Sequence, residues 1–237
     1  MESFDKYLIH GAYHWDDIDR SNIRRILSRS IPTLSRYDKI LKTIPKNAKR
    51  IVDIGCGDGA LTYLLANNEH TVEVIGCDIE KTGTILARDK IKDLPLSGKI
   101  QFIDKSFEDC QFSDQSIDAI TMCDVIEHIE EIEPLLENIK RVGKKGSVLV
   151  NTTPLKRRNC VKWDEHHVLE YTKETLFELL SFYFPKTKVT EFSPTIFYNG
   201  YHKVKILYNI LYLIGLNPLS INLGAVDHTM LFSVSYL

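Results

Sequence analysis

The strongest constraint on the fold is a buried strand that runs directly into three closely spaced glycines. Residues 50–54 read Arg-Ile-Val-Asp-Ile, a run apolar enough for a strand covered on both faces. Gly55, Gly57 and Gly59 follow at alternate positions, and glycine lets the backbone turn sharply and approach a ligand closely. A helix that begins near Ala60 would direct its N-terminal amides at that ligand. The pattern predicts a ligand-binding loop.

The charges of the loop indicate which kind of ligand it takes. A dinucleotide-binding loop reads G-x-G-x-x-G and faces a pyrophosphate. This chain reads Asp53-x-Gly55-x-Gly57-x-Gly59, with a second carboxylate at Asp58. Two carboxylates would repel a pyrophosphate but suit a cationic ligand.

An acidic residue followed by G-x-G-x-G resembles the first motif of the class I S-adenosylmethionine-dependent methyltransferases. Two further motifs agree with that family in the same order. A second predicted strand ends in Gly-Cys before Asp78, which places a carboxylate where nucleotide-binding folds hold ribose hydroxyls. A later strand ends at Cys123, and the Val-Ile-Glu127-His128 string after it is similar to one in the branch that includes ubiquinone-biosynthesis O-methyltransferases. The resemblance covers roughly residues 36–190.

The resemblance implies S-adenosylmethionine as the cofactor and assigns residues to each of its parts. The methionine moiety would lie against the glycine loop and the ribose against Asp78. Phe107 would stack on the adenine or offer its backbone amide to it, and Cys123 would contact the cofactor from the end of the fourth strand. The implied cofactor-binding residues are Asp53, Gly55, Cys56, Gly57, Asp78, Ile79, Ser106, Phe107 and Cys123.

Buried runs and helical spacings alternate along the chain, which predicts an α/β fold with helices on both faces of a mostly parallel sheet. With the resemblance, the expectation is a Rossmann-like, seven-stranded mixed sheet whose last strand is antiparallel. Strands are expected at 50–55, 71–77, 99–104, 118–123, 147–152, 188–192 and 230–236. Helices are expected at 59–67, 81–91, 130–142 and 170–184, the last with Thr172 as its N-cap.

Two additions flank this core. Residues 1–48 are expected to form an N-terminal helical cap, with Pro32 dividing its helical stretch, and residues 49–237 the methyltransferase domain. A helical insertion is expected at about 194–227; its apolar centre, 204–216, is too short to span a bilayer. That centre would be buried against the domain or the partner in a homodimer, cover the substrate as a lid, or make peripheral membrane contact.

The opening segment concentrates aromatic and titratable groups ahead of the core, at Tyr7, His10, Tyr13, His14 and Trp15. Aromatic faces in such a cap could stabilise the sulfonium of the cofactor. Ordinary packing against the edge of the sheet is the alternative.

Three histidines are the candidate catalytic residues. His128 follows the fourth strand, and His166 and His167 precede the helix expected at 170–184. A histidine titrates near neutrality and can take a proton from a hydroxyl or amine acceptor. His128 has the alternative of a structural role in the core. The acceptor is expected to be a small molecule.

Two other functions stay open. Asp124, Glu127 and His128 with a downstream histidine could bind a divalent metal, an arrangement similar to that of small-RNA 2′-O-methyltransferases. The basic run Lys-Arg-Arg at 156–158 would then touch phosphate. The main interpretation assigns no metal ligand and makes nucleic acid an unlikely partner. The third function is a catalytically idle, methyltransferase-like partner protein.

Length, charge and cysteine content limit the domain count, the partners and the location expected for this chain. The 237 residues suit one α/β domain with additions, and their formal net charge of −2 gives no global field for nucleic acid. The chain starts Met-Glu-Ser-Phe-Asp-Lys, without the apolar run of a secretory signal. An odd number of scattered cysteines indicates reduced thiols, and a cytoplasmic location is expected; the five are Cys56, Cys77, Cys110, Cys123 and Cys160.

Overall fold

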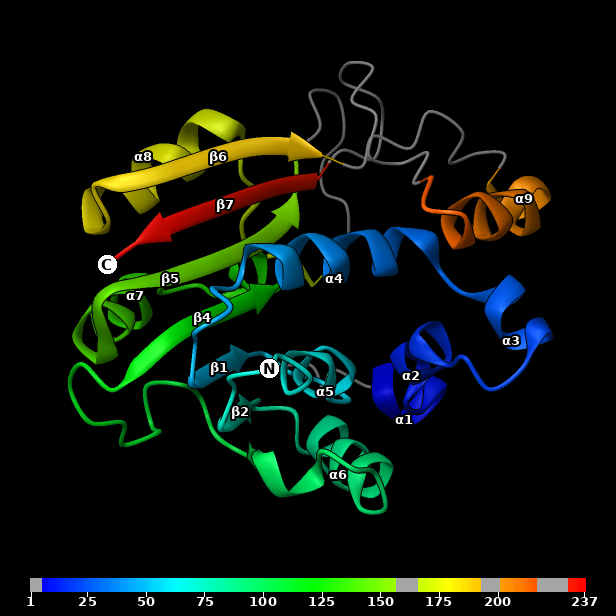
Figure 1. The fold of residues 1–237 in the computed structure, drawn as a ribbon. Coiled ribbons are helices and arrows are strands. Elements are labelled where there is room, and N and C mark those ends of the chain that lie inside the picture. Colours follow the sequence, from blue (N-terminus) through cyan, green and yellow to red (C-terminus); the bar gives the residue numbers. More distant parts are fainter. Residues whose placement is uncertain (1–5, 157–165, 193–200, 217–229) are drawn as a thin grey trace.

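A seven-stranded sheet organises the chain (Figure 1). The computed structural model describes residues 6–156, 166–192, 201–216 and 230–237. The sheet has the order β3-β2-β1-β4-β5-β7-β6. Its strands are β1 Arg50–Ile54, β2 Glu73–Cys77, β3 Ile100–Ile103, β4 Ile117–Cys123, β5 Gly143–Pro154, β6 Lys186–Phe192 and β7 Met230–Tyr236.

Helices and short 3₁₀ turns connect these strands. Those before the sheet are α1 Lys6–His10, α2 Tyr13–Ile18, α3 Ile23–Ser28 and α4 Ile31–Thr43. Those within and after it are α5 Ala60–Leu65, α6 Lys81–Ile91, η1 Ser97–Lys99, η2 Ile126–His128, α7 Glu133–Val142, α8 Lys173–Tyr183 and α9 Tyr201–Leu213. No helix among the described residues is long and apolar enough to cross a membrane.

The strand order places a ligand-binding crevice at the carboxyl ends of β1 and β4. The first five strands are parallel, and β1 pairs with β2 on one side and with β4 on the other. The chain therefore reverses its direction of travel across the sheet between β1 and β4, and open α/β sheets bind ligands at such a point. In Figure 1, α1, α2, α3 and α9 all lie beyond this carboxyl edge.

The two faces of the sheet are buried by different helices, because side chains alternate along each strand. One apolar cluster joins Val52 of β1 to α7 and α8. The other joins the neighbouring Ile51 to α4 and α5. This double burial explains why residues 50–54 read as a nearly continuous apolar run.

The expected order of elements is confirmed, with shifts at the ends. Only the last strand runs against the others: β7 pairs antiparallel with both β5 and β6, so β6 is parallel to the first five strands. Thr172 caps α8 as expected, its hydroxyl accepting a hydrogen bond from the amide of Thr175 at 3.2 Å. The helix expected from residue 130 begins only at Glu133, because residues 126–128 form the separate turn η2.

The N-terminal helical stretch is divided into two helices as expected, and Pro32 lies at the start of the second one. It lies in the first turn of α4, where proline has no helical partner to lose. The break expected at Pro32 lies just before it, where Arg29 and Ser30 are extended. The Ser30 hydroxyl caps α4 by accepting from the amide of Thr33 at 3.4 Å.

The described part of the insertion, residues 201–216, contains α9, which packs against α3 and α4. One face of α9 contributes Tyr208 to a small apolar cluster with Ile31 and Leu34 of α4. Asn209 donates to the carbonyls of Leu27 and Arg29 at 3.2 and 3.1 Å. The opposite face is exposed, so the apolar segment at 204–216 is only half buried against its own chain. Its exposed large apolar residues are Ile206, Leu207, Ile210, Leu213, Ile214 and Leu216.

Candidate active site

The glycine loop joins β1 to α5 through three residues in left-handed backbone conformations. Gly55, Gly57 and Gly59 have φ values of +66°, +52° and +77°, a region that side chains disfavour. A Cβ at Gly55 would also collide with the side chain of Val125, and Gly59 is the N-cap of α5. The loop is therefore built for glycine at each position.

Asp78, directly after β2, is hydrogen-bonded to this loop. Its Oδ2 accepts from the amide of Gly57 at 2.7 Å, and its Oδ1 accepts from the amide of Glu80 at 2.7 Å. Burial raises its pKa despite these two bonds. Ile79 beside it is 70% exposed and forms an apolar surface at the same strand end. The structure thus brings the predicted ribose-binding carboxylate and the glycine loop together.

Asp53 lies beneath the loop. It is 1% exposed, and its two carboxylate oxygens accept from the hydroxyls of Thr62 and Thr121, each at 2.7 Å. Burial raises its pKa to about 6, against the lowering effect of the two threonines. These bonds tie β1 to α5 and β4, so Asp53 fixes the position of the strand end that leads into the loop.

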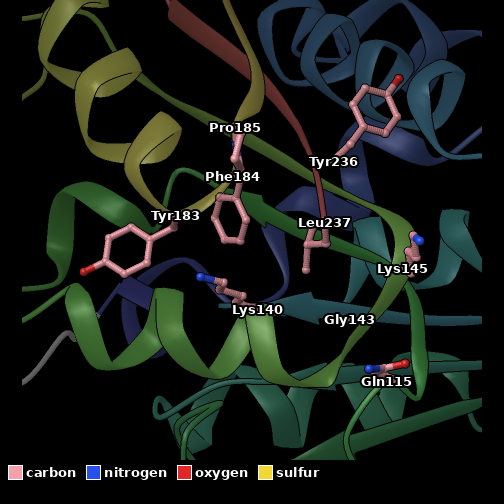
Figure 2. Close-up of a pocket in the computed structure, with 9 residues that line it drawn as sticks. All are labelled: Gln115, Lys140, Gly143, Lys145, Tyr183, Phe184, Pro185, Tyr236 and Leu237. Carbon is pink, nitrogen blue, oxygen red and sulfur yellow. The ribbon is translucent and has the colours of Figure 1, made fainter.

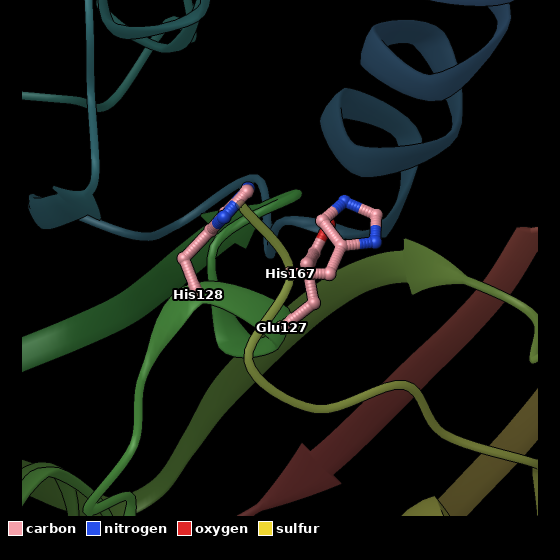
Figure 3. Close-up of side chains that lie close together, drawn as sticks. All are labelled: Glu127, His128 and His167. Atoms are coloured by element: carbon pink, nitrogen blue, oxygen red, sulfur yellow. The ribbon is translucent and has the colours of Figure 1, made fainter. Parts of the chain in front are cut away.

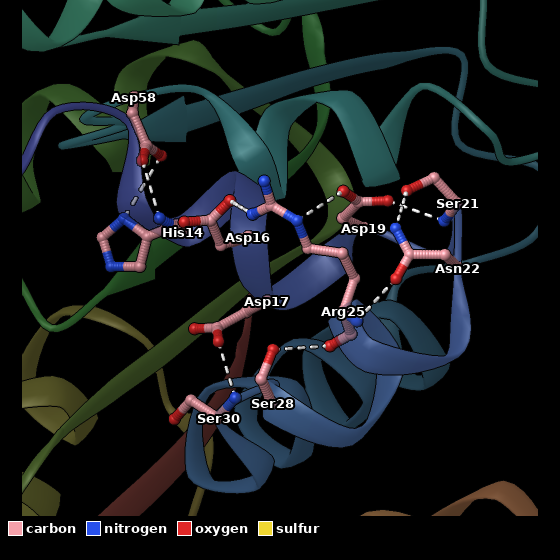
Figure 4. Close-up of polar contacts among 10 residues, drawn as sticks. All are labelled: His14, Asp16, Asp17, Asp19, Ser21, Asn22, Arg25, Ser28, Ser30 and Asp58. Atoms are coloured by element: carbon pink, nitrogen blue, oxygen red, sulfur yellow. Dashed lines mark hydrogen bonds and ion pairs between the residues drawn. The ribbon is translucent and has the colours of Figure 1, made fainter.

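Asp58 has a different role from the one its charge predicts. Its Oδ2 accepts from the amide of His14 at 3.0 Å, and its Oδ1 lies 3.2 Å from His14 Nδ1 (Figure 4). Its carbonyl accepts from Trp15 Nε1 at 2.6 Å. The expectation that this carboxylate faces a cationic ligand is wrong, because Asp58 is buried and anchors the N-terminal segment to the glycine loop.

The predicted adenine-binding pair is only partly available to a ligand. Phe107 is 2% exposed and its ring packs in the core against Phe112, with centroids 5.4 Å apart. Stacking of this ring on adenine is therefore excluded in this arrangement, which leaves the backbone amide. The Ser106 hydroxyl donates to Asp109 at 3.0 Å and accepts from its amide at 3.2 Å, which caps the turn.

Two predicted cysteines lie at the same strand ends. The side chain of Cys56 is buried in a cluster with Phe102, so its thiol is not available to a ligand in this arrangement. Cys123 ends β4 partly buried, with its sulfur 3.4 Å from the donating hydroxyl of Thr152. Burial raises the pKa of Cys123 to about 12, so it is a neutral thiol.

Arg36 is a site residue that the sequence analysis missed. It lies on α4, and its Nε is 3.2 Å from Oδ2 of Asp124, the residue after β4. Asp124 itself has a φ of +58° and accepts from Thr152 Oγ1 at 2.8 Å. The sequence gives no signal for this ion pair, because residues 36 and 124 are distant in sequence and only the fold brings them together.

Glu127, His128 and His167 form a cluster beside this strand end (Figure 3). One side-chain ligand atom from each lies within 4.8 Å of the others. Glu127 Oε2 accepts from the hydroxyl of Thr153 at 2.8 Å, while Oε1 has no hydrogen-bond partner among the described residues. Burial, helped by the charge of Asp124, raises the pKa of Glu127 to about 8.

Hydrogen bonds fix how the two histidines of the cluster can act. His128 Nδ1 lies 3.1 Å from the carbonyl oxygen of His166, which can only accept, so Nδ1 carries the proton. His167 Nδ1 lies 3.2 Å from Glu170 Oε1 and can donate to it in the same way. In the neutral rings, Nε2 then keeps its lone pair on both histidines. The predicted residue His166 takes part through its backbone, and its side chain is exposed.

The cluster fits a divalent metal by its donor set. Two imidazole nitrogens and a carboxylate oxygen, one from each of these residues, are ligands that zinc, manganese or iron accept. Without a metal, the buried Oε1 of Glu127 would lack a hydrogen-bond partner, which destabilises the fold unless this oxygen carries a proton. The raised pKa of Glu127 agrees with such a proton at neutral pH.

A pocket of about 260 Å³ lies far from this crevice, among the residues in Figure 2. It is bordered by Gly143, where β5 begins, and by Tyr236, where β7 ends. Because β5 is parallel and β7 antiparallel, both residues mark the amino edge of the parallel strands. The pocket shares no residue with the candidate site.

Comparison with known proteins agrees with this arrangement. Residues 52–151 match the family model described as a methyltransferase domain. The O-methyltransferase rstn1 of Aspergillus nomiae is 26% identical over 60% of this chain and 60% of its own length. A demethylmenaquinone methyltransferase of Bacteroides fragilis is 31% identical over 45% of this chain and 43% of its own.

Among solved structures, the Haemonchus contortus phosphoethanolamine N-methyltransferase 2 in complex with S-adenosyl-L-methionine superposes with a TM-score of 0.67. It is 17% identical, and the match covers 100% of this chain and 60% of that one. The chain thus spans about half the length of the curated relatives, and the solved structure supports the fold alone. In residues 52–151 and in its fold, the chain resembles the class I S-adenosylmethionine-dependent methyltransferases.

Proposed function

We propose that the protein transfers a methyl group from S-adenosylmethionine to a hydroxyl or amine of a small-molecule acceptor. One observation carries the proposal. The loop-bound carboxylate of Asp78 follows β2, and Glu127 and His128 of the cluster follow β4, so both lie at the carboxyl edge of the sheet on either side of β1. A cofactor-binding half and a proton-accepting half of a transfer site would therefore flank the glycine loop that follows β1.

The residues of the first half suit the chemical groups of the cofactor. Asp78 would accept from the ribose hydroxyls, and the glycine loop would admit the methionine moiety close to its backbone. Arg36 would pair with the methionine carboxylate, because it is a mostly buried cation beside Asp124 at the carboxyl end of β4. When bound, the cofactor supplies an electrophilic methyl group, so the protein needs chiefly to orient the acceptor and exclude water.

Within the second half, His128 is the proposed general base. With Nδ1 donating to the His166 carbonyl, Nε2 is the basic nitrogen of the neutral ring, and the side chain is partly exposed. His167 is 6% exposed and is better placed to orient its neighbours. His166 has weaker support, since its ring is outside the cluster.

A methyl-transfer assay tests the proposal. The protein would be incubated with radiolabelled S-adenosylmethionine and a panel of phenols, catechols, alcohols and amines. His128→Ala should lower turnover about 10²-fold or more while sparing cofactor affinity, as expected for loss of a general base. His70→Ala, at an exposed position before β2, is the matched control. Equal loss of turnover and cofactor affinity in His128→Ala would point to a structural role.

A metal-dependent RNA 2′-O-methyltransferase is the second candidate. The observation that favours it is the metal-compatible donor set of Glu127, His128 and His167. Of the basic run that would touch phosphate, only Lys156 is described, and residues 157–158 lie outside the described part of the chain. Manganese-dependent methylation of an RNA 3′ end, abolished by a chelator, would establish this function over the first.

The remaining expectations stay proposals. Residues 1–48 are proposed as a cap over the site and 49–237 as the methyltransferase domain, because α1 and α2 lie at the crevice edge. Partner contact or membrane contact through 204–216 and a cytoplasmic location are likewise proposed. An idle partner protein would bind no acceptor, so methylation of any acceptor in the panel would eliminate it. The segments 194–200 and 217–227 of the insertion, and Cys160, lie outside the described residues.

A further inference from the structure

The pocket in Figure 2 lies where the carboxyl ends of two helices meet, at the amino edge of the parallel strands. Lys140 in the last turn of α7 and Tyr183 at the end of α8 both line it. Its volume is about 260 Å³. Drug-sized ligands occupy roughly 300–1,000 Å³, so this pocket suits a smaller molecule, such as a single substituted ring.

One wall of the pocket is apolar and closely packed. Phe184 is 1% exposed and Tyr183 is 8% exposed, and their ring centroids lie 6.2 Å apart. A Cβ built on Gly143 would lie only 2.2 Å from Leu237 Cδ2, so glycine is needed for Leu237 to pack at this point. Aromatic rings associate favourably with other rings in offset or edge-to-face arrangements. This wall therefore suits a flat aromatic ligand.

The polar side of the pocket is positively charged. Lys140 from α7 and Lys145 from β5 both line it, both are exposed, and neither forms an ion pair with another described residue. Their sequence neighbours Arg141 and Lys144 are each paired with an aspartate that does not line the pocket. No aspartate or glutamate is among the described residues that line it. An anionic group on the ligand would complement the two ammonium groups.

Gln115 borders the pocket in a strained backbone conformation. Its φ is +46°, and the other described residue besides glycine with a positive φ is Asp124, at the candidate active site. The Gln115 amide donates to the Arg141 carbonyl at 3.0 Å, and the amide of Ser116 donates to the Val142 carbonyl at 2.8 Å. These carbonyls at the negative end of α7 are therefore occupied. Strained residues gather at ligand sites, and the Gln115 side chain offers a donor and an acceptor.

From these features we propose that the pocket is a second ligand site, which binds a single-ring aromatic acid. The ring packs against Phe184 and Leu237, and the carboxylate pairs with the ammonium of Lys140, which lies beside the Phe184 ring in Figure 2. Lys145 is the second cation, and Gln115 contributes its amide. The site is separate from methyl transfer, because it shares no residue with the candidate active site at the opposite edge of the sheet.

The test is a titration of the full chain with benzoate, followed by amide proton–nitrogen correlation spectra. Benzoate has no hydroxyl or amine to be methylated. Shift changes should centre on residues 115, 140–146 and 183–184, with half-saturation at about 1 mM, an affinity expected for so few atoms. Benzyl alcohol keeps the ring without the charge, and acetate keeps the charge without the ring. Each should bind about tenfold more weakly than benzoate, because each loses one of the two contacts.

Variants assign the binding to this pocket. Replacing both Lys140 and Lys145 by alanine should weaken benzoate binding about tenfold, whereas Lys90→Ala, at an exposed position on α6, should bind like wild type. Gln115→Gly removes the side-chain amide and relieves the left-handed strain. It should therefore weaken binding without lowering the melting temperature, an outcome that a purely structural role for Gln115 would not give.

Three results would overturn the proposal. They are wild-type affinity in the double lysine variant, equal binding of benzoate, benzyl alcohol and acetate, and shift changes confined to residues 125–129 at the opposite edge of the sheet. The proposed methyl transfer would stand in each case, because its residues are not altered in these variants.

Discussion

The side chain of Arg36 on α4 forms an ion pair with Asp124 directly after β4, with Nε 3.2 Å from Oδ2. The pair is mostly shielded from solvent, with side chains 19% and 28% exposed. It joins the helices before the sheet to the strand end that leads into Glu127 and His128. The ion pair therefore connects the N-terminal segment to the strand end that carries the candidate catalytic cluster.

Removal of the arginine should destabilise the fold. Arg36→Ala leaves the partly buried Asp124 with its hydrogen bond from Thr152 but without a cation, so the free energy of unfolding should fall by about 1–3 kcal/mol, less than for a fully buried pair. The pair of Arg25 with Asp16 is exposed, and Arg25→Ala should cost no more than about 1 kcal/mol. Urea denaturation followed by circular dichroism measures both. Equal losses in the two variants would contradict a special role for Arg36.

Substitution of the proposed ribose ligand should weaken cofactor binding. Asp78→Ala removes the charged acceptor and should reduce the affinity for S-adenosylhomocysteine by about 1–3 kcal/mol. Asp89→Ala removes an exposed carboxylate that pairs with Lys92 on α6, and its affinity should match wild type. Isothermal calorimetry measures the affinity of both variants for S-adenosylhomocysteine, and unchanged affinity in Asp78→Ala would show that Asp78 is not part of the site.

The protonation of Glu127 should make stability depend on pH. Its pKa is raised in the folded state to about 8, so the folded chain binds this proton more tightly than the unfolded chain. That contribution is present at low pH and is lost as the pH rises through 8. Glu127→Gln cannot ionise, so its melting temperature relative to wild type should be higher at pH 8.5 than at pH 5.5, in the presence of a chelator.

Two controls accompany this prediction. For Glu130→Gln, at an exposed position, the melting temperature relative to wild type should be the same at pH 8.5 and at pH 5.5. If the cluster binds metal, manganese should raise the melting temperature of wild type at pH 8.5 and not that of Glu127→Gln. A pH-independent difference between Glu127→Gln and wild type would show that Glu127 is ionised throughout.

The exposed face of α9 should determine whether the protein binds to membrane surfaces. Ile206 and Ile210 lie one turn apart and are 61% and 45% exposed. Lysine at both positions should abolish cosedimentation with phosphatidylglycerol vesicles if this face makes the proposed membrane contact. Phe182→Lys, at an exposed position on α8, is the matched control. If wild type stays in the supernatant with vesicles, the membrane contact is excluded, and light scattering would then test a homodimer.

The core of the fold was predictable because its signals are local. The apolar run at 50–54, the three glycines and Asp78 lie within one βαβ unit, where sequence spacing fixes spatial proximity. The regular spacing of apolar residues also predicted the order of strands and helices. Helix ends were less predictable, as Pro32 shows, because they depend on caps and neighbouring contacts.

The parts of the site that sequence could not predict depend on contacts between distant segments. Arg36 with Asp124 and His14 with Asp58 join residues that only the fold brings together. Asp58 was assigned to a ligand from its charge, which gives no information on the partner that neutralises it. Phe107 was assigned to adenine from its position, although the rotation of its ring into the core follows from packing with Phe112.

Calorimetry of the metal-stripped wild-type chain with S-adenosylmethionine and S-adenosylhomocysteine tests the central claim most directly. The account predicts binding of one cofactor per chain at about micromolar affinity, roughly −8 kcal/mol, without added metal. Absence of binding to either compound by a folded chain would contradict it.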